Sequence, residues 1–481
     1  MGVEKMKKIY LILVIIMLAT LSIQIINIHA PLNGYHNWKS SHYIIAAEHF
    51  TEDGIAAHGL FVPRIYWTET NNYTGIAQDN LPVYPLITAG AFTLFGHSVE
   101  VARAVDICFH MLNILLLFFI VFNATKKQHL AVFSSLFYAL FPITLYFSQN
   151  IQNLSTGMFF ALMSVFLIQK WYKTNKIYYF AASIAFGVIG FLSYYTFGVV
   201  IPLLILLLFP FEDFIKKLFI NFKEKKLQYF TISGLGILGV LGWLYNIRDL
   251  YIMHDIKMGR IYFLNPEWWL KSMVFWKENL GYVGLFAFGI GLYFYSRDKR
   301  LKNEQYMLFF LILSFAIIMS RKTWFHSYHW YPLLPFVAVA AGYFLYHIYK
   351  NTRENKKLLV TVGISSIFVL SSVAVVIPLY QFEPAPGNSV AGEYIYDHNV
   401  NGTIMYSGCW SGQVYGVLWH SHADGIAIPD NVSDIQRLEK QLNTQWMFIY
   451  NDFIGEIKLN YIESNYDLVL AEDGWSLYQI S

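Results

Sequence analysis

The dominant pattern along the chain is a series of long apolar stretches separated by short polar segments. We predict about eleven of them, each near the length at which a helix crosses about 30 Å of hydrocarbon. They cover approximately residues 9–29, 99–123, 128–148, 152–171, 177–194, 196–212, 228–246, 278–296, 305–320, 328–348 and 358–380. The pattern therefore predicts a polytopic α-helical membrane protein.

Composition supports this prediction. Hydrophobic residues make up 56% of the 481 residues, charged residues make up 14%, and the mean hydropathy is +0.42. A water-soluble domain of this length would not stay in solution with such a composition. The two cysteines, Cys108 and Cys409, are too few and too far apart to indicate a disulfide framework or a zinc motif.

Positive charge recurs in every second connection between the apolar stretches. The basic segments are the N-terminus with Lys5, Lys7 and Lys8, and residues 126–127, 170–176, 216–226, 297–302 and 350–357. Because loops rich in Lys and Arg stay in the cytoplasm, we expect the N-terminus to be cytoplasmic. We expect the protein to reside in the plasma membrane. Residues 30–98, 247–277, 321–327 and the segment from about 381 would then lie outside. The first stretch is predicted to be a retained helix, because no small-residue cleavage site follows it.

Two short helices are expected in the first external loop, residues 30–98. Tyr43, Ala46, Ala47 and Phe50 recur at helical spacing, which predicts an interfacial helix over residues 40–52. Residues 83–95 are apolar but too short to cross a bilayer, and they end at Gly96. We interpret them as a second interfacial helix or a re-entrant helix.

The character of the chain changes near residue 381, where a Pro- and Gly-containing linker begins. After it come three strand-like runs and one helix-like run: Gly402–Tyr406, Trp446–Tyr450, Leu468–Ala471 and Val432–Leu442. These runs predict a small soluble α/β domain. We therefore divide the chain into a transmembrane catalytic domain, residues 1–380, and an extracytoplasmic domain, residues 381–481.

Three stretches carry a resemblance to a known group of enzymes. Residues 36–50 are similar to the pattern H-x-W-R-Q-x-D-T-A-x-x-A-R-N-F, residues 81–103 to a P-x-Y-P…L-F-G…A-R run, and residues 326–335 to H-x-Y-Y-x-L-P-L-L-P. Their order and spacing over roughly residues 1–380 resemble the GT-C superfamily of polytopic glycosyltransferases. The most similar branch contains the protein O-mannosyltransferases and aminoarabinose transferases, which use polyprenyl-phosphate sugars.

The resemblance implies transfer of a sugar to an external acceptor, with inversion at the sugar carbon. Such a reaction needs a base for the acceptor hydroxyl and donors or cations for the leaving phosphate. The family's aspartate position is occupied here by His42, so the base is left open between a carboxylate and an imidazole. The candidates are Asp79, His36, His42 and Glu48, with Glu52, Asp53 and Glu69 behind them.

Substrate-binding candidates come from the same stretches and from basic residues at membrane depth. Arginine can bind a phosphate bidentately, and lysine acts as a point charge. The candidates are Trp38, Lys39, Asn80, Arg103, Arg260, Arg321, His326, Tyr328 and His329. Lys322 is expected to be an interfacial anchor, and Arg103 has an alternative role in an ion pair with Glu100 or Asp106.

Several residues are expected to have no ligand role. Asp106 and His110 lie deep in the second stretch and should find partners within the bundle. The tail residues His420, His422 and Asp424 are interpreted as isolated surface residues, because no fixed ligand spacing supports a metal.

Two alternatives to an active transferase stay open. One is a transporter or lipid flippase without covalent chemistry, and the other is an inactive transferase-like protein that only binds. The expected partners are a polyprenyl-phosphate-linked sugar, membrane lipid and an external protein, lipid or glycan acceptor, with no nucleic acid. A divalent metal is compatible with the sequence but not required by it.

Overall fold

The computed structural model describes residues 3–32, 37–58, 62–63, 76–77, 80–247, 257–259, 261–297, 302–382, 386–398, 403–407, 415–429, 431–472 and 474–480. The chain forms two compact units, each built from separate segments. Unit 1 comprises Met1–Asn27, Asp106–Gln149 and Asn153–Pro378. Unit 2 comprises Ile28–Val105, Asn150–Gln152 and Leu379–Ser481.

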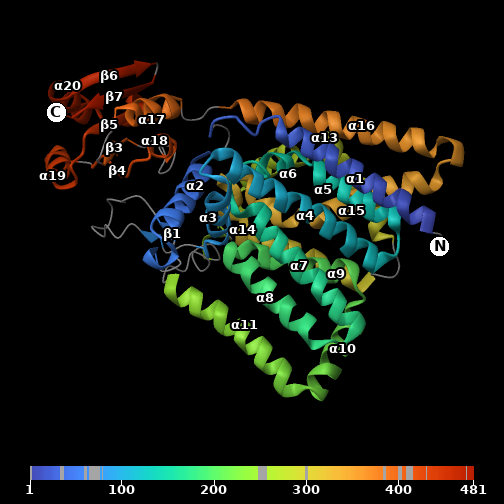
Figure 1. Cartoon of the computed structure of the whole chain (residues 1–481). Helices are drawn as coiled ribbons and strands as arrows, with labels where there is room; N and C mark the ends of the chain where they lie inside the picture. The colour runs from blue at the N-terminus through green and yellow to red at the C-terminus, as the bar shows by residue number, and fades with distance from the viewer. Residues whose placement is uncertain are drawn as a thin grey trace. The chain divides into compact units, whose positions relative to one another are not determined.

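Unit 1 is helical. Its elements, several of them labelled in Figure 1, are α1 (Val3–Ile25), α4 (Val99–Thr125, which begins in unit 2), α5 (Gln128–Leu140), α6 (Pro142–Phe147), α7 (Asn153–Thr174), α8 (Ile177–Ser193), η3 (Tyr195–Val199), α9 (Val200–Leu208), α10 (Phe211–Glu224), α11 (Lys226–Ile247), α13 (Pro266–Ser296), α14 (Lys302–Phe325), η5 (Ser327–Leu333), α15 (Leu334–Asn351) and α16 (Glu354–Gln381). Each of the predicted apolar stretches coincides with helix.

Among the described residues, seven helices are long and apolar enough to cross a membrane. The number is eight if Tyr195–Leu208 and Phe211–Glu224, which meet at 112°, form one broken span. The predicted membrane fold class is therefore confirmed. The count of eleven stays a prediction, because α5 has 13 residues and α8 has 17, fewer than the about 20 that a span needs.

Glycine allows the helices of unit 1 to approach closely. A Cβ atom on Gly291 of α13 would overlap the backbone carbonyl of Ala340 in α15, and one on Gly342 of α15 would overlap Ser134 of α5. Since lipid tails are as apolar as the side chains, helices in a bilayer associate mainly through close packing at small residues. His110 has a partner inside the unit, as predicted, because its Nδ1 lies 2.7 Å from the Gln24 amide nitrogen.

Unit 2 contains both helices predicted for the first loop. They are α2 (Asn37–Glu52) and α3 (Val83–Phe95), and the described part of the loop adds η1 (Ile55–His58) and the antiparallel pair β1 (Val62–Pro63) and β2 (Ile76–Ala77). α3 ends where predicted, at Gly96, whose φ of 89° is favourable only for glycine. In α2 the four predicted apolar residues are buried, and Ile44 and Ile45 are buried as well.

The tail forms a five-stranded sheet in the order β4-β3-β5-β7-β6. Its elements, drawn in orange to red in Figure 1, are α17 (Asn388–Asp397), β3 (Ile404–Tyr406), α18 (Tyr415–Ser421), β4 (Gly425–Ala427), α19 (Val432–Leu442), β5 (Trp446–Tyr450), η6 (Asn451–Phe453), α20 (Glu456–Asn465), β6 (Asp467–Glu472) and β7 (Trp475–Gln479). β3 is parallel to β4 and β5, and β7 is antiparallel to β5 and β6. The small α/β domain is confirmed.

Both faces of this sheet are buried at β3 and β5, whereas the edge strand β6 is largely exposed. Trp446, Phe448 and Tyr450 join a core that also contains residues of α2, α3, α17 and α18. Met447 and Ile449 point the other way, into a core with residues of α19 and α20. Alternate residues of a strand face opposite sides, so β5 serves both cores. The first loop therefore shares a hydrophobic core with the tail and groups with it in unit 2.

Candidate functional site

The predicted site residues are divided between the two units. Unit 2 contains Lys39, His42, Glu48, Asn80 and Arg103, and unit 1 contains Arg321, His326, Tyr328 and His329. His36, Asp79, Arg260 and the side chain of Trp38 lie outside the described residues. The roles assigned to all of these residues stay predictions.

The third motif builds a compact cluster in unit 1. Residues 327–333 form η5, which runs directly into α15. The Tyr194 hydroxyl lies 2.6 Å from His329 Nδ1, and the two rings stack with centroids 5.8 Å apart. Tyr328 lies against His329 at 4.2 Å and stacks on His326 at 5.4 Å. Tyr328 and His329 are buried, so their rings are held in place by packing.

A lysine lies over the same aromatic group. Lys322, in the last turn of α14, has its Nζ 4.6 Å from the ring centre of Tyr195 and 5.5 Å from that of Tyr194. Its neighbour Arg321 is partly buried. A hydroxyl, imidazoles and cationic groups on neighbouring elements of one unit are donors suited to a phosphate.

Sequence reasoning missed Tyr194. It lies in extended conformation between α8 and η3, with φ −164° and ψ 114°. A usable signal was present, because Ser193, Tyr194, Tyr195 and Thr196 interrupt an otherwise apolar run.

An aromatic cavity of about 330 Å³ borders η5. It is lined by residues of α13, α14, η5 and α15: Trp268, Trp269, Ser272, Met273, Trp276, Phe288, Ile312, Ala316, Trp330, Leu333, Phe336 and Val337. A larger cavity of about 580 Å³ lies among α7, α8, α9 and α11 and has no η5 residue in its described lining.

Arg103 makes structural hydrogen bonds. Its guanidinium is buried and donates to the carbonyl oxygens of Ile28 at 2.8 Å, Pro31 at 2.9 Å and Ala30. Glu100 lies instead 3.1 Å from His29 Nδ1. These bonds fix the segment that follows α1, while the predicted substrate role of Arg103 is untested.

The other unit 2 candidates flank α2 and α3. Lys39 and His42 lie in the first half of α2, both partly buried, and the His42 ring is 5.7 Å from that of Tyr43. Asn80 precedes α3 and is partly buried. Ser40 anchors this end of α2 by donating to the carbonyl oxygen of Asn150 at 2.8 Å.

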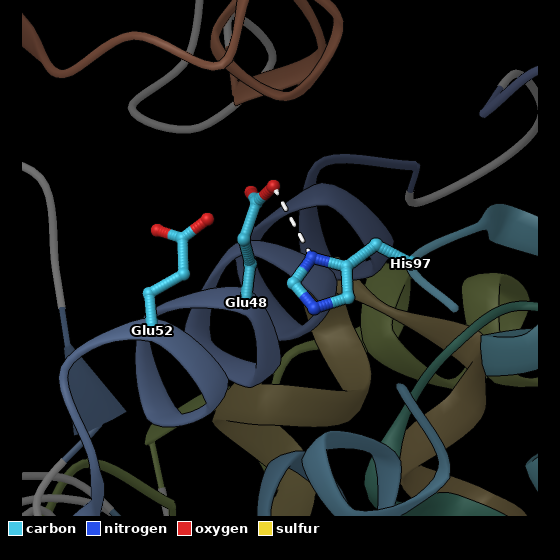
Figure 2. Close-up of side chains that lie close together, drawn as sticks. All are labelled: Glu48, Glu52 and His97. Atoms are coloured by element: carbon cyan, nitrogen blue, oxygen red, sulfur yellow. Dashed lines mark ion pairs between the residues drawn. The ribbon is translucent and has the colours of Figure 1, made fainter. Parts of the chain in front are cut away.

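Glu48 is the centre of a second polar cluster, shown in part in Figure 2. Its carboxylate accepts a hydrogen bond from His422 Nδ1 at 2.7 Å and lies 3.9 Å from His97 Nδ1. Glu52 follows one turn later on α2. The hydrogen bond to Glu48, more than any other contact, raises the pKa of His422 above its usual value. The expectation that His422 is an isolated surface residue is therefore wrong.

His420 differs from its neighbour. It is largely buried, which lowers the pKa of its imidazole, although Glu393 lies 3.9 Å away and opposes that shift. His422 thus favours the charged form and His420 the neutral form. The two histidines therefore have different partners: His420 lies near Glu393, and His422 is hydrogen-bonded to Glu48.

Comparisons with known proteins bear on both units. Residues 79–243 match the family model described as dolichyl-phosphate-mannose-protein mannosyltransferase. Crystal structures of ArnT from Cupriavidus metallidurans share the fold: the structure bound to undecaprenyl phosphate has a TM-score of 0.59 at 11% identity, and the apo structure 0.58 at 12%. The GT-C resemblance is confirmed. Each match covers 97% of both chains, so the GT-C-like fold includes the tail as well as the helical part. No protein of curated function matches the sequence significantly.

Proposed function

We propose that the protein is a membrane glycosyltransferase that moves a sugar from a polyprenyl-phosphate donor to an acceptor outside the cytoplasm. The observation that carries this proposal is the likeness over nearly the whole chain to ArnT, one structure of which is bound to undecaprenyl phosphate. The family model over residues 79–243 is named for a second polyprenyl phosphate, dolichyl-phosphate-mannose. Both comparisons thus point to the same class of donor.

Tyr194, His326, Tyr328 and His329, together with Lys322 and Arg321, form a group that we call the η5 cluster. This cluster would supply groups for the donor phosphate. Lys322 and Arg321 would balance the negative charge, and Tyr194, His326 and His329 would donate hydrogen bonds. The aromatic cavity beside η5 would hold the first isoprene units, because its lining is almost entirely apolar. Phosphate and lipid chain would then be bound by neighbouring parts of unit 1.

The chemical step needs a base and a leaving group. An acceptor hydroxyl oxygen attacks the sugar carbon C1, the bond from C1 to the phosphate oxygen breaks, and polyprenyl phosphate leaves. The hydroxyl proton passes to a base, for which we retain Asp79, His36 and His42. Inversion at C1 follows from the superfamily resemblance. Trp38, Lys39, Asn80 and Tyr328 would contact the sugar or the acceptor.

Charge distribution supports an external site. The basic segments recur in every second connection, which favours a plasma-membrane protein with the N-terminus and those segments in the cytoplasm. The first loop, η5 and the tail would then be extracytoplasmic. A cysteine-labelling experiment in intact cells, using single cysteines placed in the 350–357 connection and in the tail, tests this orientation.

The function is tested with purified protein in lipid nanodiscs, labelled polyprenyl-phosphate sugars and an extract of acceptors. Wild type should form labelled product, and Tyr194→Phe and His329→Gln should each reduce the rate by about tenfold or more, as expected for a lost donor to developing charge. His347→Gln is the matched control, since this histidine also stacks on an aromatic ring, Phe294 at 3.7 Å, but near the other end of α15.

Two outcomes would contradict the proposal. Unchanged rates in folded Tyr194→Phe and His329→Gln proteins would remove the η5 cluster from the site. In proteoliposomes, movement of the donor across the bilayer without product would favour the flippase alternative. His36→Ala and Asp79→Asn, measured beside them, decide between the two kinds of base.

A further inference from the structure

We propose that Glu48, Glu52 and His97 form a binding site for one divalent transition-metal ion, with zinc as the ion that fits them best. One ligand atom from each of the three side chains lies within 4.8 Å of the other two. All three residues belong to unit 2, and the proposal does not depend on the transferase function.

Local structure brings the three side chains together. Glu48 and Glu52 are four residues apart on α2, so their carboxylates extend from one side of the helix, as Figure 2 shows. His97 follows Gly96, whose positive φ ends α3 and turns the chain toward α4. The His97 ring stacks on buried Phe92 at 5.0 Å, with 29° between the planes. The carboxylates and the imidazole are therefore presented by separate, packed elements.

The ligand chemistry favours zinc. Two carboxylates four residues apart repel each other, and a cation between them removes that repulsion. Zinc binds imidazole nitrogen at about 2.0–2.1 Å and carboxylate oxygen at about 2.0–2.2 Å, so tetrahedral ligand atoms lie about 3.4 Å apart. Glu48 Oε1 and His97 Nδ1 are 3.9 Å apart, which requires only a small approach. Three protein ligands leave a fourth position for water.

His422 acts as a positioning residue for this site. Its Nδ1 donates to Glu48 at 2.7 Å, and such a hydrogen bond orients a metal-binding carboxylate. His422 lies 5.7 Å from Trp419, and Trp419 stacks on the same Phe92 that supports His97. Since His422 belongs to the tail, its hydrogen bond links the proposed metal ligand Glu48 to the tail within unit 2.

Zinc binding to the purified full-length protein tests the site. After chelation and dialysis against zinc, mass spectrometry should find one tightly held zinc per chain. Competition with a fluorescent zinc chelator should show affinity reduced about 10–100-fold or more by Glu52→Gln and by His97→Gln, and about tenfold by His422→Gln. Zinc should raise the melting temperature of wild type and leave that of the ligand variants unchanged.

The matched control is His49→Gln. His49 lies on the same helix and pairs with a carboxylate, Asp53 at 3.6 Å, but it is not part of the cluster. Its zinc affinity should equal that of wild type. Glu48 is buried and its replacement can unfold the loop, which is why the exposed ligands Glu52 and His97 are the decisive variants.

The proposal would be overturned by any of three results. These are zinc affinity in Glu52→Gln and His97→Gln equal to that of the His49→Gln control, no zinc retained by folded wild type, and saturation by magnesium with no binding of zinc. Magnesium would indicate a site of carboxylates and water only, because imidazole suits transition metals.

Discussion

Each of the two units of this chain is stabilised internally by a different kind of interaction. In unit 1, helices approach until glycines such as Gly291 and Gly342 lie against neighbouring backbone. In unit 2, apolar side chains cover both faces of a sheet, and imidazole–carboxylate pairs such as Glu48 with His422 join segments far apart in the sequence. In unit 1, by contrast, the ion pairs Lys216 with Glu212 and Lys357 with Glu354 each lie within one helix.

The difference follows from the surroundings of each unit. In hydrocarbon, burying an apolar side chain between helices gains little over contact with lipid, so shape decides which helices pair. Where water is available, burial of apolar surface is itself favourable. Water can also solvate the exposed atoms of imidazole–carboxylate pairs. Substitutions should therefore affect the two units through different mechanisms.

The largest effect is expected for Gly291→Val in unit 1. The added side chain would overlap the Ala340 carbonyl, which belongs to backbone and cannot rotate away, so α13 and α15 must separate. Overpacking typically costs about 1–3 kcal/mol, and a clash with backbone should reach the upper end of this range. Purified yield and thermal unfolding in detergent measure it. Gly289→Ala on the same helix has open space around its Cβ and should behave like wild type.

Arg103→Met should have the next largest effect. It removes the charged donor from the carbonyl oxygens of Ile28, Ala30 and Pro31, at a cost of about 2–4 kcal/mol. We expect a lower melting temperature, with Arg103→Lys restoring part of it. If Arg103→Met instead has the melting temperature of wild type but no longer binds the polyprenyl-phosphate sugar, Arg103 contributes to substrate binding and not to folding.

A smaller effect is expected for His422→Gln in metal-free protein. The substitution weakens the hydrogen bond to Glu48, and because the His422 side chain is 46% exposed the loss should be about 1 kcal/mol. Protease sensitivity of the tail reports on unit 2 directly. If His422→Gln increased protease cleavage in unit 1 more than in the tail, the assignment of the Glu48–His422 pair to the stability of unit 2 would be wrong.

The smallest effect is expected for Glu439→Gln in α19. Burial raises the pKa of Glu439, and its Oε1 has no hydrogen-bond partner among the described residues. The folded state thus binds the proton more tightly, so the carboxylate destabilises unit 2 once the pH rises above the raised pKa. The variant should be a few tenths of a kcal/mol more stable at pH 7. This gain should disappear as the pH falls below about 4.5, which thermal unfolding at several pH values measures.

Local patterns were sufficient to predict much of this structure. The apolar stretches predicted helices, Gly96 predicted the end of α3, and the strand-like run Trp446–Tyr450 predicted β5. In α2 the pattern identified one buried face and missed Ile44 and Ile45, which join a core shared with the tail, whose helix α18 also contacts α2. β4 has only three residues, too few to show alternation.

The candidate sites depend on pairs that no local pattern contains. Tyr194 and His329 are 135 positions apart, and Glu48 and His422 are 374 positions apart. A motif such as residues 326–335 indicates that His329 matters, but only the fold identifies the hydroxyl beside it. Likewise, the spacing of Glu48 and Glu52 is visible in the sequence, whereas the approach of His97 and His422 is not.

The shared core of the first loop and the tail has a consequence for biosynthesis. Tyr43, Ala47 and Phe50 leave the ribosome early, while the residues that cover them, such as Trp446 and Trp475, are made almost last. At about 5–20 residues per second, the tail residues that cover the loop are made about 20–85 seconds after it. Nascent chains released before the tail is synthesised would therefore contain the helices of unit 1, but the apolar residues of the first loop would stay exposed to chaperones and quality-control proteases.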